Sequence, residues 1–254
     1  MLKALKEKGT PGGFALGNAT GDGLWCNWLM WAFGGKLVDK SNKVVIDSPE
    51  TIKALEYAKE MYATFIPGTL SWLDPNNNKA FLDSQISVTN NGISIYYAAK
   101  NSTDPKVKEL QEDIQHASFP VGPVGVPTES HLFFNQMVMK YTKYPNAAKA
   151  FLQFMMEKEQ FDAWQTGAGG YIAPPLAAYA ASPIWTADPK NTPYRDAVKN
   201  MRPTGYAGKL GYASAGAGAD FIVVNMVAEA ASGSKTPKEA AERAQKRAER
   251  YYKV

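Results

Sequence analysis

The stretch at residues 23–33, GLWCNWLMWAF, is apolar around nearly its whole circumference when it is drawn as a helix. It holds three of the chain's six tryptophans, Trp25, Trp28 and Trp31. A helix without a polar side is stable in water only if other elements surround it. A chain of 254 residues is long enough to do so as one large domain or as two small ones.

The composition is that of a globular protein, with 45% hydrophobic and 20% charged residues. The sequence has no run of about 18 apolar residues, the length that a membrane-spanning helix requires. The amino-terminal MLKALKEKGTPGG also lacks the apolar segment of a secretory signal. The net charge of +4 equals the excess of seven Lys/Arg over three Glu in residues 235–254. Because this excess is typical of one solvated helix face, we expect no nucleic-acid partner.

Helical and strand-like segments alternate along the chain, which predicts an α/β fold. Strand-like stretches cover residues 36–47, around a turn, and residues 86–89. Glycine and proline cluster at residues 120–127, 167–175 and 203–218. Such breaks are typical of the crossings and site loops of a two-lobed protein.

Several helices have clear starting signals. One begins after Ser48, and the last begins after Thr236, which opens a capping box. An apolar helix is expected at residues 221–231. Residues 145–158 predict a helix whose apolar side chains, Phe151 and Phe154 among them, face inward.

The chemistry of an enzyme is hard to find in this sequence. Its two histidines form no HExxH pattern, and Cys26, the single cysteine, excludes an internal disulfide. The string GYASAG at residues 211–216 is one residue too long for a GxSxG motif. We therefore expect no metal and no cofactor. Carboxylates are plentiful, so a pair of the glycosidase type stays open.

Aromatic and amide residues gather beside the glycine-rich breaks. Rings of this kind pack on the apolar faces of sugars, and amides hydrogen-bond hydroxyl groups. The set suggests an uncharged polyhydroxy ligand and consists of Trp25, Asn27, Asn90, Asn91, Tyr96, Tyr97, Tyr171, Trp185, Tyr206 and Tyr212.

Four stretches carry a family resemblance through their order and spacing. They are ALGNATGDGLWCNWLMWAFGGKLVDKSNKVVIDSPETIKALEYAKEMY, AFLDSQISVTNNGISI, YPNAAKAFLQFMMEKEQFDAWQTGAGGYIAPPLAA and AEAASGSKTPKEAAERAQKRAERY. Together they resemble the carboxy-terminal two-thirds of an extracellular solute-binding protein of an ABC transporter. The group in question is the sugar-binding one that includes maltose-binding protein.

The resemblance implies a two-lobed α/β fold of the Venus flytrap type, with a ligand cleft between the lobes. Residues 1–118 and 168–254 would form the carboxy-terminal lobe, and residues 119–167 would cross the hinge into the other lobe. Members of the family run to about 400 residues, so residues 119–167 would lack most of their partner here. We expect the intact gene product to be longer and to carry a secretion signal.

The resemblance also implies a function. The protein would capture a sugar or polyol, deliver it to the membrane subunits of a permease, and act as a monomer in the periplasm or at the cell surface. Two alternatives stay open at this point. One is a carbohydrate-active enzyme with a carboxylate pair in the cleft, and the other is a sensory ligand-binding module.

The three tryptophans cannot all lie on one face of the helix. Positions i and i+6 are separated by about 600° of helical rotation, and i+3 lies midway between them. We expect Trp28 and Trp31 to pack in the core. The family places ligand-facing aromatics at the start of this helix, so Trp25 belongs to the core or to the cleft. Asp22 caps the helix or accepts a sugar hydroxyl.

Four further residues complete the candidate ligand-binding set. Asn91, before Gly92, ends a strand at the cleft in the family pattern, although a plain turn explains it equally well. Gly170 and Tyr171 lie at a crossing between lobes. Tyr212 is the ring nearest the place where the family carries a stacking aromatic.

Overall fold

The structure is a computed structural model, and it describes residues 1–18, 22–130, 132, 135–173 and 175–253. The longer helices are α1 (Leu2–Glu7), α2 (Trp25–Ala32), α3 (Pro49–Tyr62), α4 (Asp74–Leu82), α5 (Ser94–Lys100), α6 (Pro105–Asp113), α7 (Pro145–Met155), α8 (Lys158–Gly167), α9 (Pro183–Thr186), α10 (Thr192–Asp196), α11 (Tyr212–Ala219), α12 (Ile222–Ser232) and α13 (Pro237–Ala248). Short 3-10 turns are η1 (Asp22–Leu24), η2 (Thr69–Ser71), η3 (Ala177–Tyr179), η4 (Pro189–Asn191) and η5 (Ala197–Lys199). The two strands are β1 (Glu129–Ser130) and β2 (Met201–Arg202).

The main core forms around α2, as its apolar circumference predicts. Every residue of α2 is buried; α3 and α12 pack against it and against each other, and α13 packs in turn against α3 and α12. Trp28 stacks on Phe119, and Trp31 meets the edge of Tyr206. The expected core positions of Trp28 and Trp31 are confirmed.

The helix starts confirm the predicted caps. The Ser48 hydroxyl accepts a hydrogen bond from the Thr51 N–H at 3.2 Å, ahead of α3. Before α13, Thr236 Oγ1 accepts from the Glu239 N–H, and the Glu239 carboxylate accepts from the Thr236 N–H at 2.8 Å. These bonds occupy N–H groups that a helix start leaves without partners.

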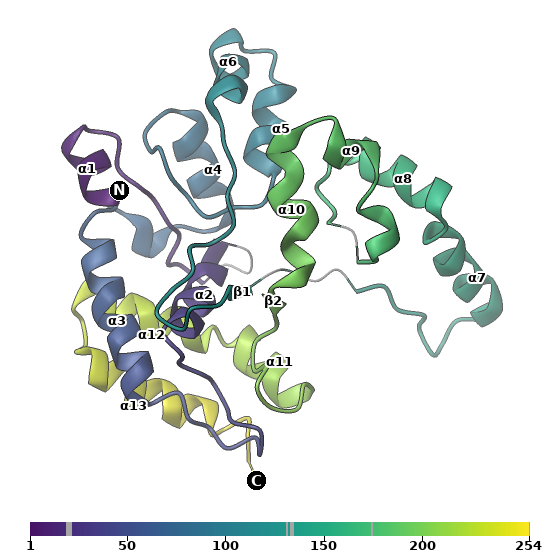
Figure 1. The fold of residues 1–254 in the computed structure, drawn as a ribbon. Helices are drawn as coiled ribbons and strands as arrows, with labels where there is room; N and C mark the ends of the chain where they lie inside the picture. Colours follow the sequence, from purple (N-terminus) through teal and green to yellow (C-terminus); the bar gives the residue numbers. More distant parts are fainter. Residues whose placement is uncertain (19–21, 131, 133–134, 174, 254) are drawn as a thin grey trace.

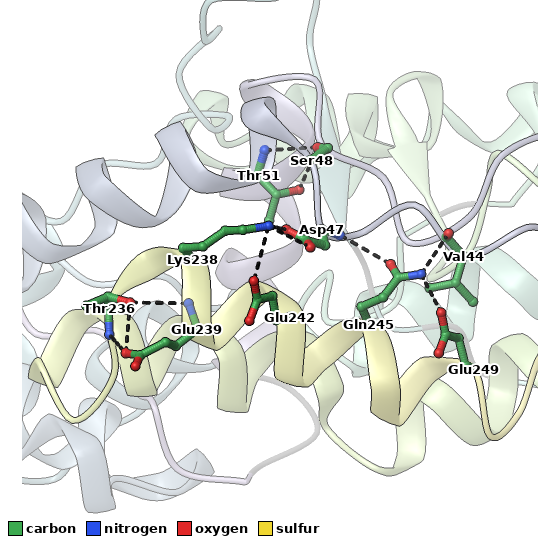
Figure 2. Close-up of polar contacts among 10 residues, drawn as sticks. All are labelled: Val44, Asp47, Ser48, Thr51, Thr236, Lys238, Glu239, Glu242, Gln245 and Glu249. Atoms are coloured by element: carbon green, nitrogen blue, oxygen red, sulfur yellow. Dashed lines mark hydrogen bonds and ion pairs between the residues drawn. The ribbon is translucent and has the colours of Figure 1, made fainter.

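Polar side chains of α13 attach it to the loop that precedes α3 (Figure 2). Gln245 Nε2 donates to the Val44 carbonyl at 3.0 Å, and Gln245 Oε1 accepts from the Asp47 N–H at 3.3 Å. Lys238 Nζ lies 2.9 Å from Asp47 Oδ2 and 3.4 Å from Glu242 Oε1. The loop before α3 therefore contacts α13 near its start, at Lys238, and near its end, at Gln245.

Strands are shorter than the sequence predicts. β1 and β2 run parallel, with Glu129 opposite Met201. Residues 36–47 contribute one antiparallel bridge, between Val38 and Val44, and residues 86–89 one parallel bridge, between Val88 and Gly12. Ser87 donates to the carbonyl of Pro11, but Pro11 has no N–H with which to extend the ladder. The fold is a helix-rich form of α/β.

The segment with α7 and α8 extends away from the main body, at the right of Figure 1. The helix expected at residues 145–158 is present, but its apolar face does not point inward. Phe151 is 59% exposed and Phe154 45% exposed, and α7 has no buried residue. The prediction of an inward face was wrong for this chain, because the main neighbour of α7 in the described part is α8 alone.

Candidate functional site

The loop between α4 and α5 holds Asn91 in a small network of amides and hydroxyls. Asn91 Nδ2 donates to Asn78 Oδ1 at 2.6 Å and to the Ser94 hydroxyl at 3.2 Å. Its Oδ1 accepts from the Gly92 N–H at 2.8 Å. The side chain is thus fixed at the start of α5. Sequence reasoning did not identify Asn78 or Ser94 as its partners; the run of asparagines at the start of α4 was the visible signal.

The turn after α8 is shaped by two glycines in the left-handed region. Gly169 has φ +60° and Gly170 has φ +78°. A Cβ on Gly169 would overlap the Tyr97 ring of α5, and one on Gly170 would touch the Trp185 ring at 3.4 Å. The turn therefore fits between α5 and α9, and backbone of this conformation at such close range favours glycine.

Two exposed tyrosines flank this turn. Tyr171 follows Gly170 and is 53% exposed, and Tyr97 is 42% exposed. The turn places Gly170 and Tyr171 beside α5, because Gly169 lies against the Tyr97 ring, and Asn91 lies three residues before the start of the same helix. Among the predicted site residues, Asn91, Gly170 and Tyr171 are thus the ones connected with α5.

Trp25 lies in the core. Its ring is fully buried, with Phe14 and Phe65 edge-on at centroid distances of 5.6 and 6.0 Å. Its indole N–H donates to the Ala15 carbonyl at 2.8 Å. The ring has neither an open face nor a free donor here, so this geometry favours the core role. Contact with a solute stays a prediction.

Two predicted residues stand apart from the others. Asp22 begins η1, immediately before α2, and its side chain lies outside the described part of the chain. Tyr212 is the first residue of α11, and its side chain is fully exposed. Figure 1 shows α11, which begins with Tyr212, and α5 at opposite ends of the α10 region.

A polar cluster, called the joint below, connects α5 and the chain after α6 with the segment around η4. It consists of Tyr96, Lys100, His116, Asp188 and Lys190. The Tyr96 hydroxyl donates to Asp188 Oδ2 at 2.6 Å, and Lys100 Nζ lies 3.6 Å from the same oxygen. His116 Nδ1 lies 2.8 Å from the Lys190 carbonyl. The His116 ring also packs edge-on between Tyr96 and Tyr194. The sequence analysis did not predict that these residues contact one another, because the contacts span more than seventy positions.

Burial and partners shift the ionisation of this joint. Burial, with the hydrogen bond to Asp188, raises the pKa of Tyr96 to about 12. Burial alone would raise the pKa of Asp188, but hydrogen bonds from Tyr96 and the Lys190 N–H and the charge of Lys100 hold it below its ordinary value. Burial lowers the pKa of His116. The joint is therefore built around a neutral histidine and a charged aspartate.

The described residues contain no group of three or more His, Cys, Asp or Glu that could hold a metal ion. None of the described helices has the length and apolarity to cross a bilayer. Two surface cavities, of about 340 and 420 Å³, flank α12 and include none of the predicted site residues. The candidate site consists of the exposed rings of Tyr97 and Tyr171 and the oriented amide of Asn91.

Comparison with known proteins places the chain in a family. Residues 1–193 match the family model of the bacterial extracellular solute-binding proteins. A probable ABC transporter-binding protein of Deinococcus radiodurans is 22% identical over 160 residues, which are 61% of this chain and 37% of that protein.

Solved structures show the same fold. A sugar transporter protein of Arthrobacter chlorophenolicus A6 with bound laminaribiose has 18% identity and a TM-score of 0.80, over 98% of this chain and 62% of that chain. A maltose-bound protein of T. maritima has 20% identity and a TM-score of 0.73, over 97% and 62%. A D-mannitol-bound solute-binding protein of Agrobacterium vitis S4 has 18% identity and a TM-score of 0.67, over 96% and 61%.

The chain spans less than two-thirds of the length of these relatives. It nevertheless follows their fold over nearly all of its own length, and the family model covers about three-quarters of it. The chain belongs to the bacterial extracellular solute-binding proteins.

Proposed function

We propose that this protein is the solute-binding component of an ABC import system and that it captures an uncharged sugar or polyol. The family match over residues 1–193 carries the proposal. The molecules bound to its structural relatives, laminaribiose, maltose and D-mannitol, support the ligand class. The protein acts as a monomer in the periplasm or at the cell surface, passes its solute to a membrane permease, and releases it unchanged.

The lobe division belongs to the same proposal. Residues 1–118 and 168–254 form one lobe, and residues 119–167 cross into the other. The Tyr96–Asp188 hydrogen bond supports this division, because it joins the two parts of the first lobe across the intervening segment. The solute then binds between the lobes, and closure is driven by contacts that exist only in the closed state.

The surface geometry supports a proposed set of solute-contacting residues. Tyr171 and Tyr97 supply exposed rings for the apolar face of a sugar, beside the turn at Gly170. Asn91 supplies an oriented amide. Asp22, Trp25 and Tyr212 complete the proposed set: Asp22 begins η1, Trp25 is the first residue of α2, and the Tyr212 side chain is exposed.

A thermal-shift screen of the natively expressed protein tests the proposal. The panel contains maltose, laminaribiose, mannitol, phosphorylated sugars and oligopeptides. A neutral sugar or polyol at one hundred times its Kd stabilises the folded state by about 2.7 kcal/mol, which raises Tm by about 5–10 °C. Chromatography of the recovered ligand should show no product. Stabilisation by peptides alone would contradict the ligand class, and turnover of a bound sugar would contradict the binding role.

Tyr171→Ala, with Tyr57→Ala as its control, tests the site. Tyr57 is also an exposed tyrosine, but it lies on α3. Loss of a stacking ring should weaken solute binding about tenfold or more in the first variant and leave it unchanged in the second. Equal affinities in both variants would remove Tyr171 from the site without touching the binding function.

A further inference from the structure

One flank of α13 concentrates positive charge. Arg243, Lys246 and Arg247 follow the spacing i, i+3 and i+4, which places them on one side of the helix, and Arg250 follows in the turn directly after it. The buried alanines of α13 occupy the side toward the core, and the residues drawn in Figure 2 occupy the flank that faces the loop before α3. The basic flank is therefore a separate surface.

This flank lines a surface cavity of about 420 Å³ together with Asp220 and Asn225. Arg247 is held in place, because its Nη2 donates to the Asp220 carbonyl at 2.6 Å and lies 2.9 Å from Asp220 Oδ1. Its side chain is 16% exposed. Arg243 is fixed by an ion pair with Glu229 on α12. Two guanidinium groups are thus positioned before any ligand arrives.

The charges of the cavity do not cancel. Four cations meet two carboxylates, Asp220 and Glu229, which leaves two positive charges unmatched. Within the described part of the chain, no ion pair engages Lys246 or Arg250. The contacts of the two held arginines use one nitrogen each, so further N–H donors of each fork remain for a ligand.

We propose that this cavity binds a phosphate group. Free phosphate carries close to two negative charges near neutral pH, which equals the unmatched charge of the cavity, and the phosphodiester of a lipid headgroup carries one, which offsets part of it. Guanidinium forks suit its oxygens in bidentate geometry, and a lysine adds a compact point charge. A neutral sugar would leave the excess charge unmatched, and a metal cation would be repelled. The phosphate belongs either to a free anion or to a lipid headgroup.

The proposed phosphate site is independent of the solute site. Its residues lie on α12, α13 and the turn between α11 and α12, whereas Tyr171 and Asn91 lie beside α8 and α5. The phosphate proposal can fail while sugar binding stands, and sugar binding can fail while phosphate still binds.

The test compares Lys246→Ala/Arg250→Ala with Lys53→Ala/Lys59→Ala. Both double variants remove two exposed cations, but the second removes them from α3. Sodium phosphate is titrated into each full chain by calorimetry at constant ionic strength, with chloride as the reference anion. We expect saturable binding of one phosphate, weakened at least about tenfold in the α13 variant and unchanged in the α3 variant. Circular dichroism and the urea midpoint verify that both variants fold.

A second arm distinguishes the two sources of phosphate. Co-sedimentation uses vesicles of phosphatidylglycerol in phosphatidylcholine and vesicles of phosphatidylcholine alone. Binding to the anionic vesicles that depends on Lys246 and Arg250, without binding of free phosphate, supports the site and assigns it to a headgroup. If the unmodified chain binds neither probe, or if both double variants weaken binding equally, the proposal is overturned.

Discussion

Gly169 is the residue on which the arrangement of the exposed tyrosines depends most directly. Its positive φ turns the chain at the end of α8, and its missing side chain makes room for the Tyr97 ring. The two requirements are different in kind. One concerns the backbone of Gly169 itself, and the other concerns a neighbour from a distant part of the sequence.

Gly169→Ala should therefore lower the free energy of unfolding by about 2–4 kcal/mol. About 1 kcal/mol comes from the left-handed backbone and about 1–3 kcal/mol from overlap with Tyr97. Gly233→Ala is the control, because Gly233 has φ +75° but a Cβ there meets nothing within 4 Å. Its loss should be about 1 kcal/mol. Urea unfolding measures the free energy of unfolding of both variants. Equal losses would show that the Tyr97 side chain moves aside at no energetic cost.

His116 should make stability depend on pH. Burial lowers its pKa in the folded state, so the unfolded chain binds the proton more readily. The neutral ring then contributes full stability above pH 6.5, the ordinary value, and the contribution falls as the pH drops from 6.5 toward the folded pKa. The surrounding groups are Tyr96, Tyr194, Lys190 and Asp188, and Asp188 titrates below its ordinary value, outside this window.

The measurement is urea unfolding at pH 7.5 and pH 5.5 for the unmodified chain and for His116→Gln. The unmodified chain should lose stability between the two values, and the variant should lose less because it has no imidazole to protonate. An identical loss in both proteins would assign the pH dependence to other groups.

At the scale of single elements, the attachment of α13 separates two kinds of polar contact. Gln245 both donates to the Val44 carbonyl and accepts from the Asp47 N–H, in a partly buried position. The ion pairs of Lys238 are more exposed and therefore screened by solvent.

Gln245→Ala should cost about 1–3 kcal/mol of unfolding free energy, since it leaves two backbone groups without their partners. Lys238→Ala should cost less, and its effect should shrink in 0.5 M salt, because salt screens the interaction between exposed charges. Urea titrations at low and high salt measure both variants. A larger and salt-independent loss at Lys238 would reverse this ranking.

The elements that the sequence predicts correctly depend on local chemistry. Ser48 and Thr236 cap their helices through contacts three residues away. The features that the sequence misses or leaves open involve contacts with other segments. Pairing at residues 86–89 ends because the partner strand contains Pro11, and the core position of Trp25 depends on Phe14 and Phe65. A helix that is apolar all around gives no periodicity with which to separate a core face from a ligand face.

At the scale of the whole molecule, the exposed face of α7 differs from the rest of the surface. Phe151 and Phe154 project from a helix that contacts mainly α8, away from the body of the protein (Figure 1). Exposed apolar patches of this kind mark surfaces that another part of a protein covers, or surfaces that associate. The family resemblance implies a second lobe in this position.

The double variant Phe151→Ser/Phe154→Ser distinguishes an α7 face that a second lobe covers from one that stays exposed and associates. In the 254-residue chain the phenyl rings are largely outside the core, so the double variant should change the free energy of unfolding by less than about 0.5 kcal/mol. It should also reduce self-association in light scattering, because two exposed rings are lost. In the natively expressed protein, a covering lobe would bury both rings, and the same change should cost about 3 kcal/mol or more. Equal, small effects in both forms would show that α7 stays uncovered and that residues 119–167 do not pack into a second lobe.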